Sequence, residues 1–359
     1  MKKFFVSLLI FLLLAAGGTG YAFYWWANAP LQFAPPKLDA TIKGHSSLRS
    51  VAVQLAQAGV PIQPQLFVAL TRVLRLSAQL KAGNYEFETG ITPYEVLDKI
   101  ARGDVNEFVV TVIDGWNFHQ MRAELDANPE LRHDTAGWSD AQILQALAVP
   151  VEAAHHALAN PASVPLPDPV QTAAIDPAID LAEGRFFPDT YLFDKATSDL
   201  DIYRRAMTLM DQRLAQLWAA RAPDLPYKTP YDALIMASLV EKETGRASDA
   251  PLVAAVFVNR LKRGMPLQTD PSVIYGIGSR YSGHLHKKDL QTDGPYNTYT
   301  RVGLPPTPIA LPGANALQAA LNPAQSTALY FVARGDGSSL FSDTLEAHNR
   351  AVNKYIRGE

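Results

Sequence analysis

The chain has 359 residues, 48% of them hydrophobic, and a formal net charge of −3. Its length allows roughly two domains of the usual ~100–200 residues, and its hydrophobic content excludes a largely disordered protein. The weak negative charge does not indicate a nucleic-acid-binding protein. The absence of cysteine excludes disulfides, thiolate catalysis and cysteine-ligated zinc.

The N-terminal segment predicts a membrane anchor. Lys2 and Lys3 form a short cytoplasmic tip at residues 1–3, and residues 4–27 carry no charge and exceed the ~20 residues that span a bilayer. Aromatic residues gather at the far end, as is common at membrane interfaces, and the positive tip predicts a cytoplasmic N-terminus. A cleaved signal peptide with its apolar region at residues 4–16 is the alternative. Either interpretation places the globular part outside the cytoplasmic membrane.

Residues 28–37 are rich in proline and predict an extended tether. Residues 38–110 then predict a small α+β module. Its helices are expected at 47–57, 64–76 and 92–103, where Thr92-Pro93-Tyr94-Glu95 forms a capping box with proline at the first helical position. Its strands are expected at the alternating segment around residues 81–87 and at the β-branched segment 105–113.

Residues 111–359 predict a larger domain of the same α+β class. Helices are expected at 116–125, 140–147, 199–219, 315–320 and 344–356, and a strand at 328–333. The signals lack the regular alternation of a doubly wound sheet, so the fold class is α+β. An Ala- and Pro-rich insertion lies at about 150–180, and a loop of this length inside a domain is uncommon.

The central part of this domain is residues 231–278. A helix entered through Thr229-Pro230 ends in two acids, Glu241 and Glu243, against the usual preference of the helix dipole for cations at this end. A second helix is expected from Ser248 to Gly264, followed by a polar loop, 268–271. Two helices and a polar loop around an acid pair predict a cleft.

The candidate chemistry is that of carboxylates. The sequence contains no nucleophile elbow, no HExxH motif and no Gly-rich phosphate loop. Residues two apart on a helix point ~200° apart, so Glu241 and Glu243 are not expected to face one cleft together. One is therefore catalytic and the other structural, unless both are simply solvated acids. The aromatic segment 183–191 fits either a sugar-binding wall or ordinary core packing.

Three segments carry a family resemblance: LVEKET at Leu239–Thr244, VNRL at Val258–Leu261 and LQTDPSVIYG at Leu267–Gly276. They resemble the endolytic murein transglycosylase (YceG-like) family. Further matches occur in the family's order, at residues 81–85, 183–184, 187–190, 296–299, 303–306 and 348–349. Asp114-Gly115 departs from the family's usual Glu-Gly, a chemically mild change.

The resemblance implies a single-pass inner-membrane protein with a LysM-like module and a periplasmic catalytic domain. It also implies cleavage within nascent peptidoglycan glycan strands, with the membrane and peptidoglycan synthases as partners. The second glutamate of the family's ExE motif corresponds to Glu243, the expected catalytic residue. No nucleic acid, metal or cofactor is implied.

We expect two further groups of residues around Glu243. Sugar contacts and the orientation of Glu243 are assigned to Gln268, Thr269, Asp270, Tyr275 and Asn297. Supporting roles are assigned to Glu241, Asn259, Glu183 and Asp189, with Glu241 as a charge that raises the pKa of Glu243.

Two other functions stay open at the level of the sequence. A hydrolytic muramidase would use a second carboxylate, Asp270 or Glu183, to hold a water molecule. A non-catalytic glycan-binding scaffold would use the LysM-like module and the anchor alone, and Glu243 would then be dispensable.

Overall fold

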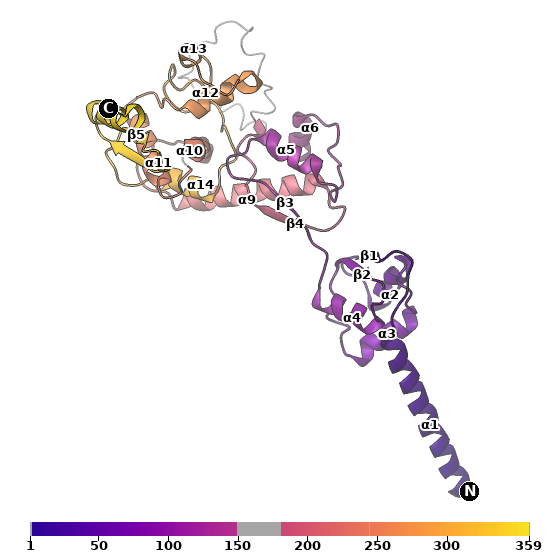
Figure 1. The fold of residues 1–359 in the computed structure, drawn as a ribbon. Coiled ribbons are helices and arrows are strands. Elements are labelled where there is room, and N and C mark those ends of the chain that lie inside the picture. The colour runs from indigo at the N-terminus through magenta and orange to yellow at the C-terminus, as the bar shows by residue number, and fades with distance from the viewer. Residues whose placement is uncertain (1, 149–180, 244, 359) are drawn as a thin grey trace. The chain divides into compact units, whose positions relative to one another are not determined.

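The computed structural model describes residues 2–148, 181–243 and 245–358 (Figure 1). The predicted insertion at about 150–180 lies outside the described residues. The chain forms two compact units, Met1–Val109 with Leu192–Ala196, and Val110–Tyr191 with Thr197–Glu359. Mixed helix and strand content in each unit agrees with the predicted fold class.

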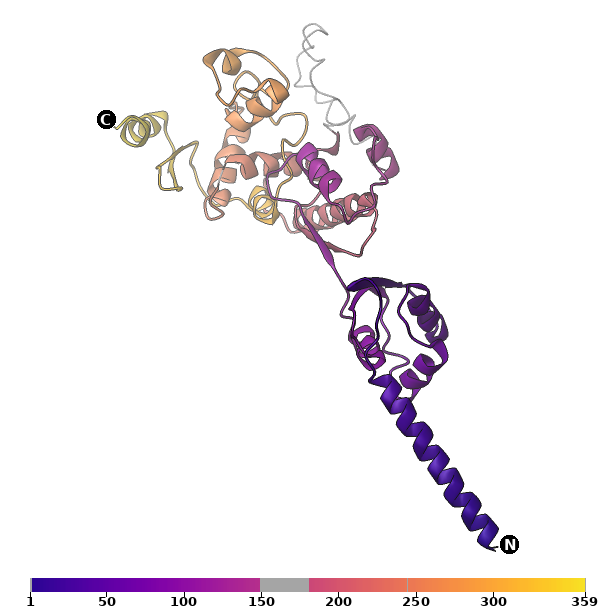
Figure 2. The same ribbon diagram turned by 45° about the vertical axis from the view of Figure 1, so that its right-hand side comes forward.

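The first unit begins with a long apolar helix, α1 (Lys2–Ala27), drawn in indigo as one unbroken helix in Figure 2. Its stretch Phe4–Ala27 is the one candidate membrane span among the described residues, by length and composition. The predicted helix is therefore present, and both the anchor and the signal peptide are compatible with it.

The remainder of this unit packs three helices against a two-stranded sheet. Strands β1 (Lys37–Ile42) and β2 (Gly83–Glu88) are antiparallel, and helices α2 (Leu48–Gln57), α3 (Pro64–Val73) and α4 (Pro93–Arg102) surround them. The predicted capping box is present, since Thr92 Oγ1 accepts a hydrogen bond from the Glu95 amide and the Glu95 carboxylate accepts one from the Thr92 amide. The LysM-like identity of this module stays a prediction.

A second two-stranded sheet joins β3 (Phe108–Thr111) and β4 (Thr190–Phe193). Helices α5 (Phe118–Ala127) and α6 (Asp140–Ala146) come after β3 in the chain, and the long helix α9 (Asp199–Ala219) comes after β4. All three helices were expected from the sequence; α9 has the expected ends, and those of α5 and α6 agree to within two residues.

The second unit contains the expected acid-bearing helix, α10 (Pro230–Glu243), and its neighbour α11 (Ala250–Lys262). The chain then forms α12 (Asp270–Ile277), a 3-10 turn at Gly278–Arg280, α13 (Lys287–Gln291) and α14 (Ala314–Leu321). It ends with the antiparallel strands β5 (Tyr330–Ala333) and β6 (Ser339–Ser342), helix α15 (Leu345–Val352) and a π-helical turn at Asn353–Arg357.

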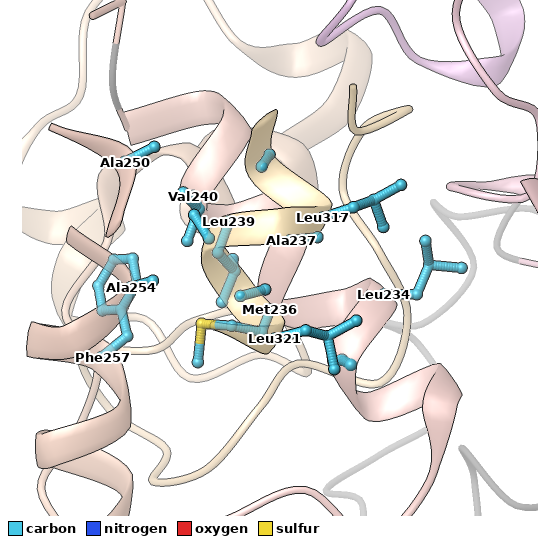
Figure 3. Packing of buried hydrophobic residues seen from close by; sticks show 14 of the residues in the cluster. Leu234, Met236, Ala237, Leu239, Val240, Ala250, Ala254, Phe257, Leu317 and Leu321 are labelled. Atoms are coloured by element: carbon cyan, nitrogen blue, oxygen red, sulfur yellow. The ribbon is translucent and has the colours of Figure 1, made fainter. Parts of the chain in front are cut away.

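Helix α10 lies in the centre of the second unit's core. Every residue from Ala233 to Val240 is buried, and α11 and α14 contribute Phe257, Leu317 and Leu321 to the same cluster (Figure 3). A helix that is apolar on all sides is a buried helix, and full burial of one Leu or Phe side chain contributes about 1.5–3 kcal/mol. This packing holds the C-terminal end of α10, with its two glutamates, in a defined place.

The structure differs from the expected elements in several places. Strands β1, β4 and β6 and helix α13 were not expected from the sequence pattern. Asp249, rather than Ser248, occupies the N-cap position of α11. The loop 268–271 opens α12, with Thr269 at the N-cap position and Pro271 in the first turn, where its missing N–H costs nothing.

The aromatic segment 183–191 belongs to the protein core. Phe186 is fully buried and stacks on Phe118 at 5.3 Å, and Phe187 and Tyr191 are also buried. Of the two interpretations of this segment, ordinary core packing agrees with the structure.

Candidate active site

Glu243 ends α10 at a cavity of about 350 Å³ in the second unit. The lining side chains come from α10, α11, the loop before α12, the start of α12, the loop after α13, β5 and α15. They are Glu243, Arg260, Leu267, Gln268, Asp270, Tyr299, Phe331 and His348. The cavity thus combines two carboxylates, one cation and an aromatic wall.

The environment of Glu243 favours the protonated carboxyl. Burial raises its pKa above the usual 4.5, and the nearby Asp270 carboxylate raises it further. The side chain of Thr269 acts in the opposite direction through hydrogen bonding. Thr269 Oγ1 is buried and makes no hydrogen bond of ordinary geometry within the described part of the chain. The contact through which it lowers the pKa of Glu243 is therefore longer than an ordinary hydrogen bond. Because burial has the largest effect on the pKa of Glu243, its carboxyl is suited to act as a general acid.

The second carboxylate of the cavity, Asp270, is held by a phenol. Tyr299 Oη donates a hydrogen bond of 2.5 Å to Asp270 Oδ1. Burial raises the pKa of Tyr299, and the Asp270 and Glu243 carboxylates raise it further, so the phenol stays protonated as the donor. This bond fixes the position of the Asp270 carboxyl group beside Glu243.

A strained turn presents Gln268 and Asp270 to the cavity, whereas Thr269 between them is fully buried. Gln268 has a φ of 53°, in the left-handed region that side chains other than glycine rarely adopt. Thr298 holds the turn: its carbonyl accepts the Gln268 amide at 3.0 Å, and its Oγ1 accepts the Thr269 amide at 3.0 Å. The same hydroxyl lies 2.9 Å from Ser272 Oγ. Strain of this kind persists only where surrounding contacts determine the conformation, and it is common at functional sites.

Glu241 faces a different region. Its Oε2 accepts a hydrogen bond of 3.0 Å from the Gly313 amide, and a side chain at Gly313 would lie 2.6 Å from the Asp114 carboxyl carbon. Burial raises the pKa of Glu241 and the Asp114 charge adds to this, against the Gly313 hydrogen bond. Asp270, rather than Glu241 as expected, is the charged residue that raises the pKa of Glu243. The expected separation of the two glutamates around the helix is therefore present.

Six other predicted site residues do not line this cavity: Thr269, Tyr275, Glu183, Asn297, Asn259 and Asp189. Tyr275 donates a 3.3 Å hydrogen bond to the buried Glu183 carboxylate, which also accepts one from the Phe118 amide. Asn297 donates to three backbone carbonyls of the α13 region. Asn259 donates to the carbonyls of residues 326 and 328. These contacts suit residues that hold the walls in place.

Asp189 lies beside the Glu241 region and not on the cavity. Its carboxylate accepts a 2.8 Å hydrogen bond from the Thr190 amide. It also raises the pKa of Asp114, which burial has already raised. Asp114, the residue that departs from the family pattern, is thus part of a second group of carboxyls with Glu241 and Asp189.

The sequence pattern assigned no site role to Arg260, Tyr299, Phe331 and His348. Arg260 had two available signals, its place in the matched motif VNRL and its charge within the mostly apolar helix α11. Tyr299 and His348 lie in matched motifs, yet nothing in the sequence shows that they meet at Glu243. Phe331 is an ordinary strand residue by its pattern.

Two other places in the structure have features of a site. A larger open cavity of about 760 Å³ in the first unit is lined by Lys43 and Arg49 among polar and small apolar residues, without a carboxyl, and so lacks a group for acid catalysis. Ligand atoms of Asp126, His133 and Asp199 lie within 4.8 Å of one another, as a metal site would require. However, the Asp199 carboxylate already accepts hydrogen bonds from three backbone amides and from Thr135 Oγ1.

Comparison with known proteins gives consistent results. The model of the YceG-like family matches residues 40–354. The chain is 31% identical over 321 residues to an endolytic murein transglycosylase of Bacillus subtilis (strain 168), covering 89% of this chain and 85% of that protein. It is 27% identical over 374 residues to one of Streptococcus pneumoniae serotype 2 (strain D39 / NCTC 7466), covering 100% of this chain and 66% of that protein.

A solved structure is also similar. The crystal structure of a YceG-like protein from Listeria monocytogenes has a TM-score of 0.52 and 28% sequence identity, covering 88% of this chain and 99% of that one. The family model extends over both compact units and includes Glu243 and every residue that lines its cavity. This chain belongs to the YceG-like family.

Proposed function

We propose that the chain is an endolytic lytic transglycosylase that cleaves MurNAc–GlcNAc bonds within nascent peptidoglycan strands and so limits their length. The observation that carries this proposal is the placement of Glu243, a carboxyl with a raised pKa on a cavity lined by polar and aromatic side chains. Its relatives from Bacillus subtilis and Streptococcus pneumoniae are endolytic murein transglycosylases.

The proposed reaction uses Glu243 twice. Its carboxyl donates a proton to the glycosidic oxygen as the bond from that oxygen to MurNAc C1 breaks, and positive charge develops at C1. The C6 hydroxyl of the same sugar then attacks C1, and the Glu243 carboxylate takes up its proton. The new C1–O6 bond closes a 1,6-anhydro ring, and the glutamate returns protonated. Because neither water nor an enzyme nucleophile enters, one carboxyl suffices where most glycosidases use two.

Asp270 has a supporting role in this scheme. Its negative charge helps to hold the proton on Glu243 until substrate binds, and Tyr299 keeps that charge in place through its hydrogen bond. Gln268 and Thr269, on the same turn, orient the sugar and the glutamate. Tyr275, Asn297, Asn259 and Glu183 position the surrounding elements.

A hydrolytic muramidase is the second candidate, because Asp270 shares the cavity with Glu243. In that case Asp270 would act as the base that activates a water molecule, and the products would have free reducing ends.

The rest of the chain fits an enzyme at the cell surface. We assign α1 as a single-pass anchor in the inner membrane, with its N-terminus in the cytoplasm and residues 28–359 in the periplasm. Residues 28–37 tether the LysM-like module at residues 38–110, which would contact glycan, while residues 111–359 form the catalytic domain. Peptidoglycan synthases, which release the nascent strands, are the proposed protein partners.

The test compares products from uncrosslinked glycan strands by mass spectrometry, using the full-length protein in detergent. Glu243→Gln removes the acid, and Glu241→Gln is the matched control, since it makes the same change two residues away on a different surface. Anhydro ends that are lost only in Glu243→Gln support the proposal. Reducing ends would indicate the muramidase. Binding without cleavage by the wild-type protein would indicate a glycan-binding scaffold.

A further inference from the structure

Arg260 is a buried cation in the wall of the Glu243 cavity. Its residue surface is only 7% exposed, although it lines the cavity. Nε donates a 2.7 Å hydrogen bond to the Leu329 carbonyl. Nη1 donates to the carbonyls of Pro266 and Leu267 and to Gln268 Oε1, at 3.0–3.1 Å. These contacts occupy the donors of Nε and Nη1.

The remaining nitrogen, Nη2, is different. A guanidinium has five N–H donors, and among residues 2–148, 181–243 and 245–358 no side chain or carbonyl accepts a hydrogen bond from Nη2 of Arg260. Within the same residues no carboxylate forms an ion pair with Arg260, and all its acceptors are neutral oxygens. Burial without a counter-charge lowers the pKa of Arg260. A buried charge is costly unless it is paired, so a site for an anion is expected here.

The aromatic neighbours of Arg260 bring no negative charge to this side of the cavity. Its guanidinium lies over the Tyr330 ring at 5.1 Å, and the His348 ring stacks on Tyr330 at 5.2 Å. Burial and the charge of Arg260 both lower the pKa of His348, so the imidazole is neutral and does not compete for an anion. The two carboxylates of the cavity, Glu243 and Asp270, are instead grouped with Tyr299.

We propose that Arg260 Nη2 binds a carboxylate of the substrate, within the same cavity in which Glu243 acts on the glycosidic bond. This inference rests on the proposed function, since it names the part of a peptidoglycan strand that the cavity recognises. Arginine suits the task because its planar donors match a carboxylate. Two sources carry this chemistry in such a strand: the lactyl ether of a MurNAc that has lost its peptide, and the acidic groups of the stem peptide.

The competing explanation is that Arg260 only holds the turn at residues 266–268, through the three acceptors that it contacts there. Substrate charge separates the two roles. Replacing a residue that only holds the turn affects charged and neutralised substrates alike, whereas replacing one that also binds a carboxylate lowers activity on the charged substrate further.

The experiment uses strands with free carboxylates and the same strands after amidation of those carboxylates. Cleavage by the full-length wild-type protein is measured as kcat/KM, and binding is measured separately with the full-length Glu243→Gln variant. We expect the charged strand to be preferred about 10- to 100-fold, the usual effect of a hydrogen bond to a charged group. In Arg260→Gln this preference is expected to disappear: any loss from the loosened turn falls on both strands, and the charged strand loses about 10- to 100-fold more than the amidated strand.

The outcomes are distinct. Equal use of both strands by the wild-type protein overturns the inference, even if Arg260→Gln does not fold. Equal loss on both strands in a folded Arg260→Gln protein shows a structural role and also overturns it. If the wild-type protein cleaves neither strand, the proposed function is contradicted. The binding assay then still shows whether the charged strand binds more tightly than the amidated strand, and so decides the role of Arg260.

Two further substrates identify the source of the carboxylate. Strands stripped of peptides by an amidase expose only lactyl carboxylates, and strands with intact but amidated peptides expose none. A preference for stripped strands assigns the lactyl group. A preference confined to strands with free peptide carboxylates assigns the stem peptide.

Discussion

Glu243 and Glu241 lie two residues apart at the end of α10 but have separate surroundings. Glu243 lines the cavity beside Asp270, whereas Glu241 accepts a hydrogen bond from the Gly313 backbone. Both have a raised pKa, mainly through burial. A raised pKa alone therefore does not separate the two acids, and the cavity is the observation that favours Glu243 as the proposed catalytic residue.

The first prediction concerns the rate. Glu243→Gln is expected to lower kcat by about 10²- to 10⁴-fold, the usual contribution of general acid–base catalysis. Glu241→Gln keeps an oxygen acceptor for the Gly313 amide and is expected to retain most of the activity. Single-turnover cleavage of glycan strands checks both. Equal losses in the two variants would contradict the assignment of Glu243.

The second prediction concerns the pH dependence of cleavage. Because burial and Asp270 raise the pKa of Glu243, its proton is retained above the usual carboxyl pKa of 4.5, and activity falls as pH rises through the higher value. Asp270→Asn removes the charge that contributes to this shift, so the alkaline limb of kcat/KM is expected to move to lower pH. A limb that stays in place would show that Asp270 does not act on Glu243.

The third prediction concerns stability and pH. The pKa of Glu241 is higher in the folded state, so its neutral form favours folding at low pH, and this contribution is lost as pH rises through the folded pKa. Glu241→Gln is expected to raise the melting temperature at neutral pH and to leave it nearly unchanged at acidic pH. Thermal unfolding across this pH range checks it. A variant that is less stable at neutral pH would mean that the hydrogen bond from Gly313 outweighs burial.

The fourth prediction concerns the approach of Gly313 to Asp114. A Cβ at position 313 would lie 2.6 Å from the Asp114 carboxyl carbon, so Gly313→Ala forces a shift and is expected to cost about 1–3 kcal/mol. Gly294→Ala is the control, because a Cβ there meets no atom within 4 Å. Urea unfolding compares them, and similar midpoints for the two variants would contradict the close approach.

The fifth prediction concerns the turn that carries Asp270. Thr298→Val keeps the side-chain shape but removes the acceptor of the Thr269 amide, and a buried unsatisfied N–H costs about 1–3 kcal/mol. Thr300→Val, at an exposed position, is the control and is expected to stay within about 0.5 kcal/mol of the wild type. Cleavage is expected to fall only in Thr298→Val, as the turn loosens. Unchanged unfolding and activity would show that Thr298 does not hold the turn.

Local patterns predicted much of the secondary structure, because caps and periodicity act over a few residues. The capping box of α4 and the apolar run of α10 are examples. Helix α12 was missed, since Thr269-Asp270-Pro271 looks the same as a turn or as a helix start. The contacts of Thr298 with this segment decide between the two, and Thr298 lies 29 residues beyond Thr269 in the chain.

The sequence by itself determined the α+β class, the apolar N-terminal helix, the family and the acid pair as the centre of the chemistry. Helix geometry also separated Glu241 from Glu243, because two residues on one helix have a known angle between them. Only the tertiary structure decided what surrounds each acid. The cavity brings Glu243 together with Asp270, Arg260, Tyr299 and His348, which lie on separate elements. The pKa shifts and the unpaired charge arise from this packing between distant parts of the chain, which no local sequence pattern specifies.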